Sequence, residues 1–379
     1  MTLRMPSKEA LPPYVRGLVE VLADPGRSVD LDLATWDGVV RVARSSQLLG
    51  TLAARMDAAG LMARCPAPVR NHLRAATMEA RFLRHMALLE IELVARALAP
   101  RGVPLVLLKG AGYVAADLPM AAGRMLRDVD LLVPRHRLAE VESTLFDAGW
   151  RTDERLDAYD QRYYRAWSHQ LPPMRRADAP LEVDVHHAIL PVTGRIRPDS
   201  EALMRDAIPT GRGWKVLDPA DRVVHAAVHL FQDSNCTDRL RDVVDIDALC
   251  RDLAAREAGF WARLVQRAEL HGAMRPVGYA IEFARGWFGT PVGDEFDAAW
   301  RRARGRWASG WVIRRAQHSL PPTDFEQGRD RDQLRAARWM FLRSMWLRMP
   351  PWLLAYHAAM KVWRGTIARS QRPPGAGNR

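Results

Sequence analysis

The sequence contains little cysteine. Its 379 residues include only Cys65, Cys236 and Cys250, and no two of these stand at the spacing of a zinc site. So few thiols exclude a disulfide framework and favour a reducing compartment, so we expect a cytoplasmic protein. The first residues, MTLRMPSKEALPPYV, lack the apolar core of a signal peptide. No apolar run reaches the roughly 18 residues that a membrane span needs.

Lysine is also scarce, since only Lys8, Lys109, Lys215 and Lys361 are present. The net charge is +12, but residues 333–379 contain nine basic residues and no acidic one, which leaves +3 for the remaining residues. A nearly neutral main body gives no strong signal of nucleic-acid binding. The scarcity of lysine makes Lys109 notable, because it follows an apolar run.

Two common nucleotide-binding motifs and internal repeats are missing. The chain has no G-x-x-x-x-G-K-[ST] P-loop and no G-x-G-x-x-G turn of a dinucleotide-binding fold. These absences exclude the two motifs that most often identify phosphate-binding α/β proteins.

The spacing of apolar residues predicts helices on both sides of a small α/β unit. WDGVVRVARSSQLLG and MEARFLRHMALLEIELVARAL have helical spacing, and PADRVVHAAVHLF, RLRDVVDIDALCRDL and FWARLVQRAELHG follow the unit. We therefore predict a helical region over 1–102, a catalytic core over 103–195 and a second helical region over 196–330. A basic, tryptophan-rich helical segment covers 331–368, and 369–379 is expected to be disordered.

The predicted core alternates strands and helices. PLVLLKG and VDLLV read as buried strands, AGYVAADL and RHRLAEVESTLFDAG as helices, and SHQLPPM and LEVDVHHAI as two further strands. The expected order is strand–helix–strand–helix–strand–strand.

Acidic residues lie on these apolar strands. Asp128 and Asp130 project from one strand face, about 6.6 Å apart, and Glu182 and Asp184 repeat the pattern. Carboxylates that repel one another in a desolvated place require a positive charge between them. Hard oxygen ligands suit Mg²⁺ or Mn²⁺, and a metal site of this kind supports in-line transfer at phosphorus. An isolated D-x-D pair can also cap a turn or bridge surface arginines.

The turn KGAG, residues 109–112, leaves the first strand and enters a helix. Glycines there let backbone amides face an anion at a helix N-terminus. A lysine–glycine turn is weak evidence by itself.

The three motifs together, VLLKGAG, RMLRDVDLLV and EVDVHH, resemble the nucleotidyltransferases of the DNA polymerase β superfamily. The likeness is greatest to a poorly characterised branch associated with exopolysaccharide and lasso-peptide biosynthesis clusters. It implies an α+β fold: a small mixed-sheet, polymerase-β-like core with large N- and C-terminal helical additions. The superfamily turn usually carries Gly-Ser or Gly-Gly, whereas this chain has Lys-Gly-Ala-Gly.

The resemblance also implies roles for single residues. Asp128, Asp130 and Asp184 would bind Mg²⁺ or Mn²⁺ and act in catalysis, with Glu182 the other choice for the third ligand. The phosphates of the nucleotide would contact Lys109, Gly110, Gly112, Arg124 and Arg127. The alternative interpretation is that one of these two arginines neutralises the carboxylates when no metal is bound.

Several histidines and aspartates have less specific readings. His186 shares the acidic face and is a candidate for substrate contact, whereas His187 points to the core. His225 and His229 have metal-ligand spacing without an evident third ligand, so structural or nucleotide-facing roles are favoured. Asp242 and Asp245 are read as polar packing contacts.

The basic tail holds Trp339, Trp346, Trp352 and Trp363 among arginines. It has three readings: packing on the protein's own body, peripheral contact with an anionic membrane, or binding of an acidic partner.

The leading hypothesis is an enzyme, a metal-dependent nucleotidyltransferase. It would transfer NMP from an NTP donor to an acceptor, which the sequence leaves open among a sugar, a peptide, a small molecule and a protein, with release of pyrophosphate. The alternative is a non-catalytic nucleotide-binding or assembly protein of a biosynthetic cluster. A toxin that modifies tRNA would use the same chemistry, but the near-neutral body gives it little support.

Overall fold

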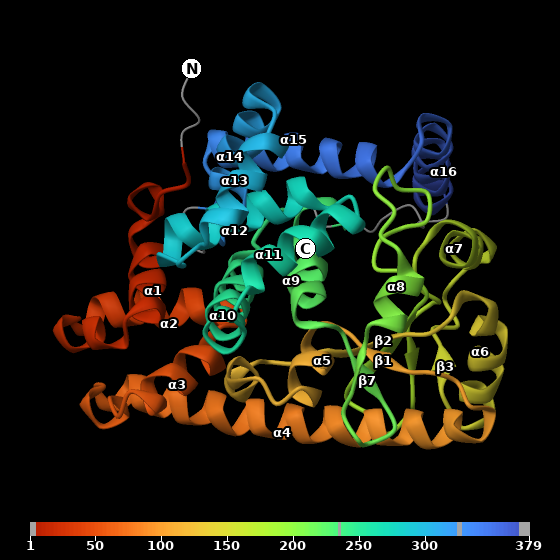
Figure 1. Ribbon diagram of the computed structural model, residues 1–379, viewed down its shortest axis with the longest axis horizontal. Coiled ribbons are helices and arrows are strands. Elements are labelled where there is room, and N and C mark those ends of the chain that lie inside the picture. Colours follow the sequence, from red (N-terminus) through yellow and green to blue (C-terminus); the bar gives the residue numbers. More distant parts are fainter. Residues whose placement is uncertain (1–4, 234–235, 324–327, 371–379) are drawn as a thin grey trace.

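The computed structural model describes residues 5–233, 236–323 and 328–370 (Figure 1). One seven-stranded mixed sheet lies toward one side, and helices from both ends of the chain surround it. This arrangement confirms an α+β core with large N- and C-terminal helical additions. Residues 371–379 of the tail expected to be disordered lie outside the described residues.

Two five-residue strands form the centre of the sheet. β2 (Asp128–Leu132) and β5 (Glu182–His186) run parallel, and both alternate fully buried apolar residues with polar ones. The strand order is β3-β4-β5-β2-β1-β7-β6. The outer strands have two residues each: β1 (Val106–Leu107), β3 (Arg151–Thr152), β4 (Met174–Arg175), β6 (Ile208–Pro209) and β7 (Lys215–Val216). Only β2–β5 and β1–β7 are parallel pairs.

The two strand–helix units at the start of the core are confirmed. β1 leads into α5 (Lys109–Ala115), and β2 is followed by α6 (Leu138–Asp147). The strand predicted for SHQLPPM is wrong over most of its length, because Pro172 and Pro173 have no amide hydrogen to donate to a ladder. Gln170 makes one bridge to β5, and β4 starts only at Met174. The sheet also continues beyond residue 195, through β6 and β7.

The N-terminal helices lie beneath and beside the sheet (Figure 1). They are α1 (Pro13–Ala23), α2 (Leu33–Ser45), α3 (Leu49–Ala58) and α4 (Ala67–Leu98). α2 begins at Asp32, whose side chain accepts a hydrogen bond from the Thr35 amide at 2.8 Å. In α4 the buried residues recur at helical spacing, so one side of this long helix packs along α3, α6 and β2.

The helices from residue 200 to residue 319 share one hydrophobic core with the sheet and the N-terminal helices. They are α8 (Ser200–Arg205), α9 (Pro219–Val228), α10 (Leu240–Arg256), α11 (Phe260–Leu270), α12 (Met274–Phe288), α13 (Asp294–Ala303) and α14 (Arg306–Ser319). Their largest buried side chains include Phe283, Trp287 and Trp300, and Phe231 of the π-helical turn η8 (His229–Asp233) packs beside Phe283. α9 contacts α5 and so joins these helices to the region of the sheet.

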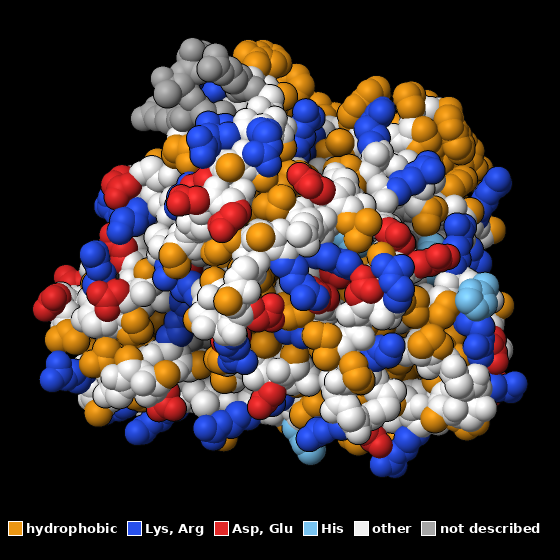
Figure 2. All heavy atoms as spheres, viewed as in Figure 1, with side chains coloured by type: hydrophobic (Ala, Val, Ile, Leu, Met, Phe, Trp, Pro, Cys, Tyr) orange, Lys and Arg blue, Asp and Glu red, His pale blue; other side chains and the backbone are white. Residues whose placement is uncertain are grey.

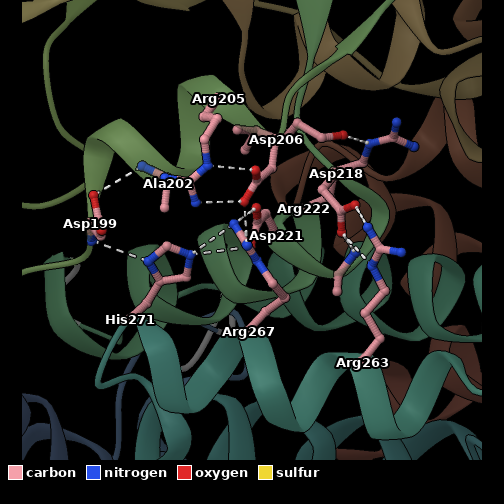
Figure 3. A network of polar contacts seen from close by, with 12 residues as sticks. Asp199, Ala202, Arg205, Asp206, Asp218, Asp221, Arg222, Arg263, Arg267 and His271 are labelled. Atoms are coloured by element: carbon pink, nitrogen blue, oxygen red, sulfur yellow. Dashed lines mark hydrogen bonds and ion pairs between the residues drawn. The ribbon is translucent and has the colours of Figure 1, made fainter.

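A buried ion-pair network fixes α9 against α11 (Figure 3). Asp218 accepts a hydrogen bond from the Ala220 amide at the start of α9 and pairs with Arg263 of α11. Asp221, fully buried in α9, pairs with Arg267 at 2.5 Å. Because each buried carboxylate has an arginine partner, the network orients α9 without leaving an isolated charge.

The basic segment forms α15 (Arg331–Arg348) and α16 (Pro351–Ser370), which lie along the upper edge in Figure 1. α16 packs on a short insertion before β4, formed by α7 (Ala158–Arg162) and a π-helical turn, η7 (Tyr163–Trp167). None of the helices in the described ranges combines the length and apolar character that crossing a membrane requires.

Candidate active site

The parallel pair β2–β5 brings the acidic residues together. Its register sets Asp130 beside Asp184 and Asp128 beside Glu182. Side chains alternate along a strand, so all four belong to one face of the pair. Asp130 is buried, Asp184 is half-buried and Glu182 is exposed. Of the two acids considered for the third position, Asp184 is therefore the one enclosed with Asp130.

Lys109 provides the positive charge at these carboxylates. Its Nζ lies 2.7 Å from Asp130 Oδ1, and His186 Nε2 lies 2.9 Å from the same oxygen. Lys109 starts α5 with a φ of 42°, a left-handed conformation that residues other than glycine adopt only at a cost. The surrounding contacts, which include the ion pair with Asp130, hold this strained turn between β1 and α5.

One ammonium group does not compensate all three acids. Burial opposes ionisation of Asp130, but Lys109 and His186 outweigh it and hold its pKa well below the usual range. The charge of Asp130 and burial raise the pKa of Asp128. Burial and the charge of Asp130 raise the pKa of Asp184 to about 6. The site therefore keeps a deficit of positive charge around Asp128 and Asp184.

Three of these side chains fit a divalent metal ion. Ligand atoms of Asp130, Asp184 and His186 all lie within 4.8 Å of one another. Asp130 Oδ2 and Asp184 Oδ1 are buried and have no hydrogen-bond partner among the described residues. Unpaired buried carboxylate oxygens are costly unless a cation binds them, so the donor set fits such an ion. Asp128 is outside this cluster, and sequence reasoning assigned His186 to substrate contact and not to the metal.

A polar cavity of about 270 Å³ opens beside the carboxylates. Its walls come from the junction of α2 and α3, the β1–α5 turn, the segment before β2, and α9 and α10. They are formed by Ser45, Ser46, Gln47, Lys109, Gly110, Tyr113, Arg124, Leu126, Arg127, Asp128, Ala226, His229, Asp238, Arg239, Arg241, Asp242 and Asp245. Five of the residues predicted for the site therefore share one cavity, and both helical additions complete it.

The two predicted glycines have different surroundings. Gly110 lines the cavity, and a Cβ there would lie 2.6 Å from Leu126 Cδ2. Gly112 does not line it, because it packs on β1, where a Cβ would lie 2.7 Å from the Leu107 carbonyl oxygen. Close packing of α5 on the strand is a sufficient physical reason for Gly112.

The two predicted arginines also differ. Arg124 is buried, pairs with Asp245 at 2.5 Å and lies over the Tyr113 ring at 5.4 Å. Its direct partner is thus a carboxylate of α10 and not the acids of β2. Arg127 is exposed at the cavity, and no carboxylate of the described residues lies within ion-pair distance of it. Asp242 pairs with Arg239 at 2.8 Å, so Asp242 and Asp245 both make polar contacts, as the sequence predicted.

Arg241 was missed by sequence reasoning. Its guanidinium donates a hydrogen bond to the Gln47 side chain, and no carboxylate of the described residues lies within ion-pair distance. Burial and the charge of Arg124 lower the pKa of Arg241 to about 10. An arginine whose charge is this poorly compensated favours an anion in the cavity. The signal in the sequence was RLRDVVDID itself, where two basic residues stand in the first turn of the predicted helix.

His225 of α9 and His229, which follows the end of α9, do not form a metal site within the described residues. His225 is buried, and burial together with Lys109 lowers its pKa well below the ordinary value. His229 Nε2 lies 2.8 Å from Arg239 at the cavity. His187 follows the end of β5 and is buried, and burial and Arg135 lower its pKa to about 4.

Acidic strands beside an arginine-lined cavity, in an α+β core with helical additions, are the arrangement expected of a nucleotidyltransferase. A protein-family model described as "Uncharacterised nucleotidyltransferase" matches residues 32–289. The match covers more than half of the chain, which therefore belongs to this family. It includes every wall of the cavity. Comparison with curated proteins and with solved structures found no match.

Proposed function

We propose that this protein is a metal-dependent nucleotidyltransferase, which transfers NMP from an NTP to an acceptor hydroxyl and releases pyrophosphate. The observation that carries the proposal is the pair of unpartnered, buried oxygens on Asp130 and Asp184 next to the arginine-lined cavity. Membership of the nucleotidyltransferase family supports it.

Asp130, Asp184 and His186 would hold the divalent ion, with Asp128 at the cavity mouth as a further ligand when substrate is present. Mg²⁺ or Mn²⁺ would neutralise phosphate charge there, and the imidazole makes Mn²⁺ the better-suited ion of the two.

The cavity side chains favour the phosphate groups of the donor. Arg241 and Arg127 can each bind phosphate oxygens without giving up a carboxylate partner. Arg124 and Arg239 are already paired with Asp245 and Asp242, so they shape the cavity and add less net charge. We therefore place the triphosphate against Arg241 and Arg127, between α10 and the segment before β2.

Asp184 is suited to receive the proton of the acceptor. The acceptor oxygen forms a bond to the α-phosphorus while the bond from that phosphorus to the pyrophosphate oxygen breaks, and the hydroxyl proton passes to Asp184. Burial and the charge of Asp130 raise the pKa of Asp184 in the absence of metal, and a bound divalent ion would offset both, so that the carboxylate would be ionised and able to accept the proton.

The test is calorimetric titration of the full chain with ATP, GTP, CTP and UTP, each with Mg²⁺, Mn²⁺ or a chelator. We expect metal-dependent binding of at least one nucleotide, lost in Asp184→Asn. Arg241→Gln should weaken nucleotide binding about tenfold to a hundredfold and leave binding of the metal alone unchanged. Asp117→Asn is the matched control, since Asp117 is exposed and pairs only with Arg84. Binding that is equal with and without metal would contradict the proposal.

A second candidate is a non-catalytic nucleotide-binding or assembly protein. It is favoured by the Lys109–Asp130 pair, which supplies a resident cation without metal. Nucleotide binding that survives both the chelator and Asp184→Asn, with no pyrophosphate released from any NTP, would establish this candidate instead.

A further inference from the structure

The outer side of α15 and α16 concentrates exposed hydrophobic side chains. Of 19 large hydrophobic residues exposed in the described part of the chain, nine belong to these two helices, far more than their share of the length. They are Leu334, Trp339, Phe341, Leu342, Trp346, Trp352, Tyr356, Val362 and Trp363. Figure 2 shows hydrophobic side chains gathered along the upper right edge, where Figure 1 places α16. We call this set the α15–α16 face.

The inner sides of both helices are already occupied by the protein's own body. Met340 and Leu353 are buried. Arg343 donates a hydrogen bond to the Phe231 carbonyl oxygen at 2.5 Å and anchors α15. Arg364 holds α16 through Asp160, with both nitrogen–oxygen distances at 3.1 Å. Both helices are therefore docked on the protein through their inner sides, and the α15–α16 face stays exposed although the helices are docked.

Basic side chains predominate around this face, since Asp332, which pairs with Arg335, is the single acidic residue of α15 and α16. From residue 333 to the end of the chain there is no acidic residue, and Arg335, Arg338 and Lys361 are exposed. Trp346 lies under the Arg195 guanidinium, 4.1 Å from its ring centre. Tryptophan rings flanked by arginine and lysine are suited to the boundary between lipid headgroups and acyl chains.

An open hollow of about 550 Å³ adjoins the face and adds a place for headgroups. Its walls include Arg329, Arg331, Arg335 and Arg338 together with Leu334 and Phe341. Guanidinium groups beside apolar side chains match the phosphodiester and the first methylenes of a phospholipid. An acidic protein would satisfy the arginines, but it would leave the exposed tryptophans and Val362 in water.

We propose that the α15–α16 face docks the protein on an anionic phospholipid surface. The helices lie in the interface with their tryptophans inserted and the arginine-lined hollow against the headgroups. The protein does not span the bilayer. This binding does not depend on nucleotidyl transfer, since it uses no residue of the candidate active site.

Flotation of the full chain with vesicles tests the proposal. We expect the chain to float with phosphatidylcholine vesicles that contain phosphatidylglycerol, and to float far less with phosphatidylcholine alone or in high salt. Trp352→Ser/Val362→Ser/Trp363→Ser should reduce binding about tenfold or more, and circular dichroism and the melting temperature check that the variant is folded. Met78→Ser/Phe82→Ser is the matched control, since both side chains are exposed on α4, at the opposite edge in Figure 1.

Three results would overturn the proposal. The first is that the chain binds neither kind of vesicle, and the second is that the α4 variant loses as much binding as the α16 variant. The third is that the wild type binds no vesicles but forms a concentration-dependent dimer in sedimentation, and that the α16 variant does not form this dimer. That result would assign the face to a second copy of the chain.

Discussion

Replacement of Lys109 by methionine tests the electrostatics of the site directly. The substitution keeps most of the side-chain volume and removes the ammonium group that lies 2.7 Å from Asp130 Oδ1. Asp130 is 1% exposed, so its carboxylate would lose its strongest partner in a place that water does not reach. Removing one partner of a buried ion pair costs about 3–5 kcal/mol. His186 still contacts the same oxygen, so we expect about 3 kcal/mol at neutral pH without metal.

The same variant separates the ammonium group from the metal as sources of stabilisation. If the carboxylates bind a divalent ion, a hundredfold excess of metal over Kd stabilises the folded state by about 2.7 kcal/mol. The effect should be larger in Lys109→Met than in the wild type, because the ion no longer competes with an ammonium group for Asp130. The double variant Lys109→Met/Asp130→Asn should be less destabilised than the sum of its single variants.

Urea unfolding followed by circular dichroism, with and without Mn²⁺, measures these differences. Lys215→Met is the control, since Lys215 lies on β7 away from the cavity. The unfolding free energy of this variant should differ from that of the wild type by less than about 0.5 kcal/mol. A loss below about 1 kcal/mol in Lys109→Met would refute the ion-pair argument. A metal effect equal in the double variant and the wild type would refute the assignment of the ion to Asp130.

Three further predictions concern stability. Burial and a neighbouring carboxylate raise the pKa of Asp184 to about 6, above its unfolded value, so the folded state binds the extra proton and stability falls as pH rises from about 4 to 6. Asp184→Asn should reduce this fall but not abolish it, since the pKa of Asp128 is raised as well, and urea midpoints across that range will show the difference. Arg124→Met leaves Asp245 buried without its partner and should cost about 3 kcal/mol in the same unfolding assay, whereas Arg124→Met/Asp245→Asn should recover part of it. Gly123→Ala would place a Cβ 2.1 Å from the Gly50 carbonyl oxygen, so we expect a loss of stability of about 2 kcal/mol or more. The melting temperature should fall accordingly. An unchanged melting temperature would mean that the segment around Gly123 moves away freely.

The fold was predictable where a short sequence pattern determines by itself which side chains of a segment are buried. Alternation in VDLLV and EVDVH predicted two strands with an acidic face, and the structure contains both, paired with Asp130 beside Asp184. The two-residue strands β6 and β7 carry too few residues for any periodicity to show. Their place in the sheet depends on pairing with β1, which is set by contacts distant in sequence.

The candidate site was predictable only for residues that belong to the strands and the turn. Asp130 and Asp184 follow from strand geometry, and Lys109 follows from the β1–α5 turn. Gln47 and Arg241 are 194 positions apart in sequence and meet only where the α2–α3 junction lies against the start of α10. No local pattern marks such a pair, so the sequence indicated Lys109, Arg124 and Arg127 but not Arg239 and Arg241 of the same cavity.

The raised pKa values favour a metal over Lys109 as the final counter-charge. If the ammonium group alone satisfied the site, the carboxylates beside it would ionise easily. Instead burial and the charge of Asp130 keep the pKa of Asp184 near 6, and the pKa of Asp128 is raised as well. Two buried carboxylate oxygens also have no partner among the described residues. A divalent ion would remove both deficits, whereas a purely structural role for Lys109 would leave them in place. This difference is the physical reason to prefer a site that binds a divalent ion to one in which Lys109 is the final counter-charge.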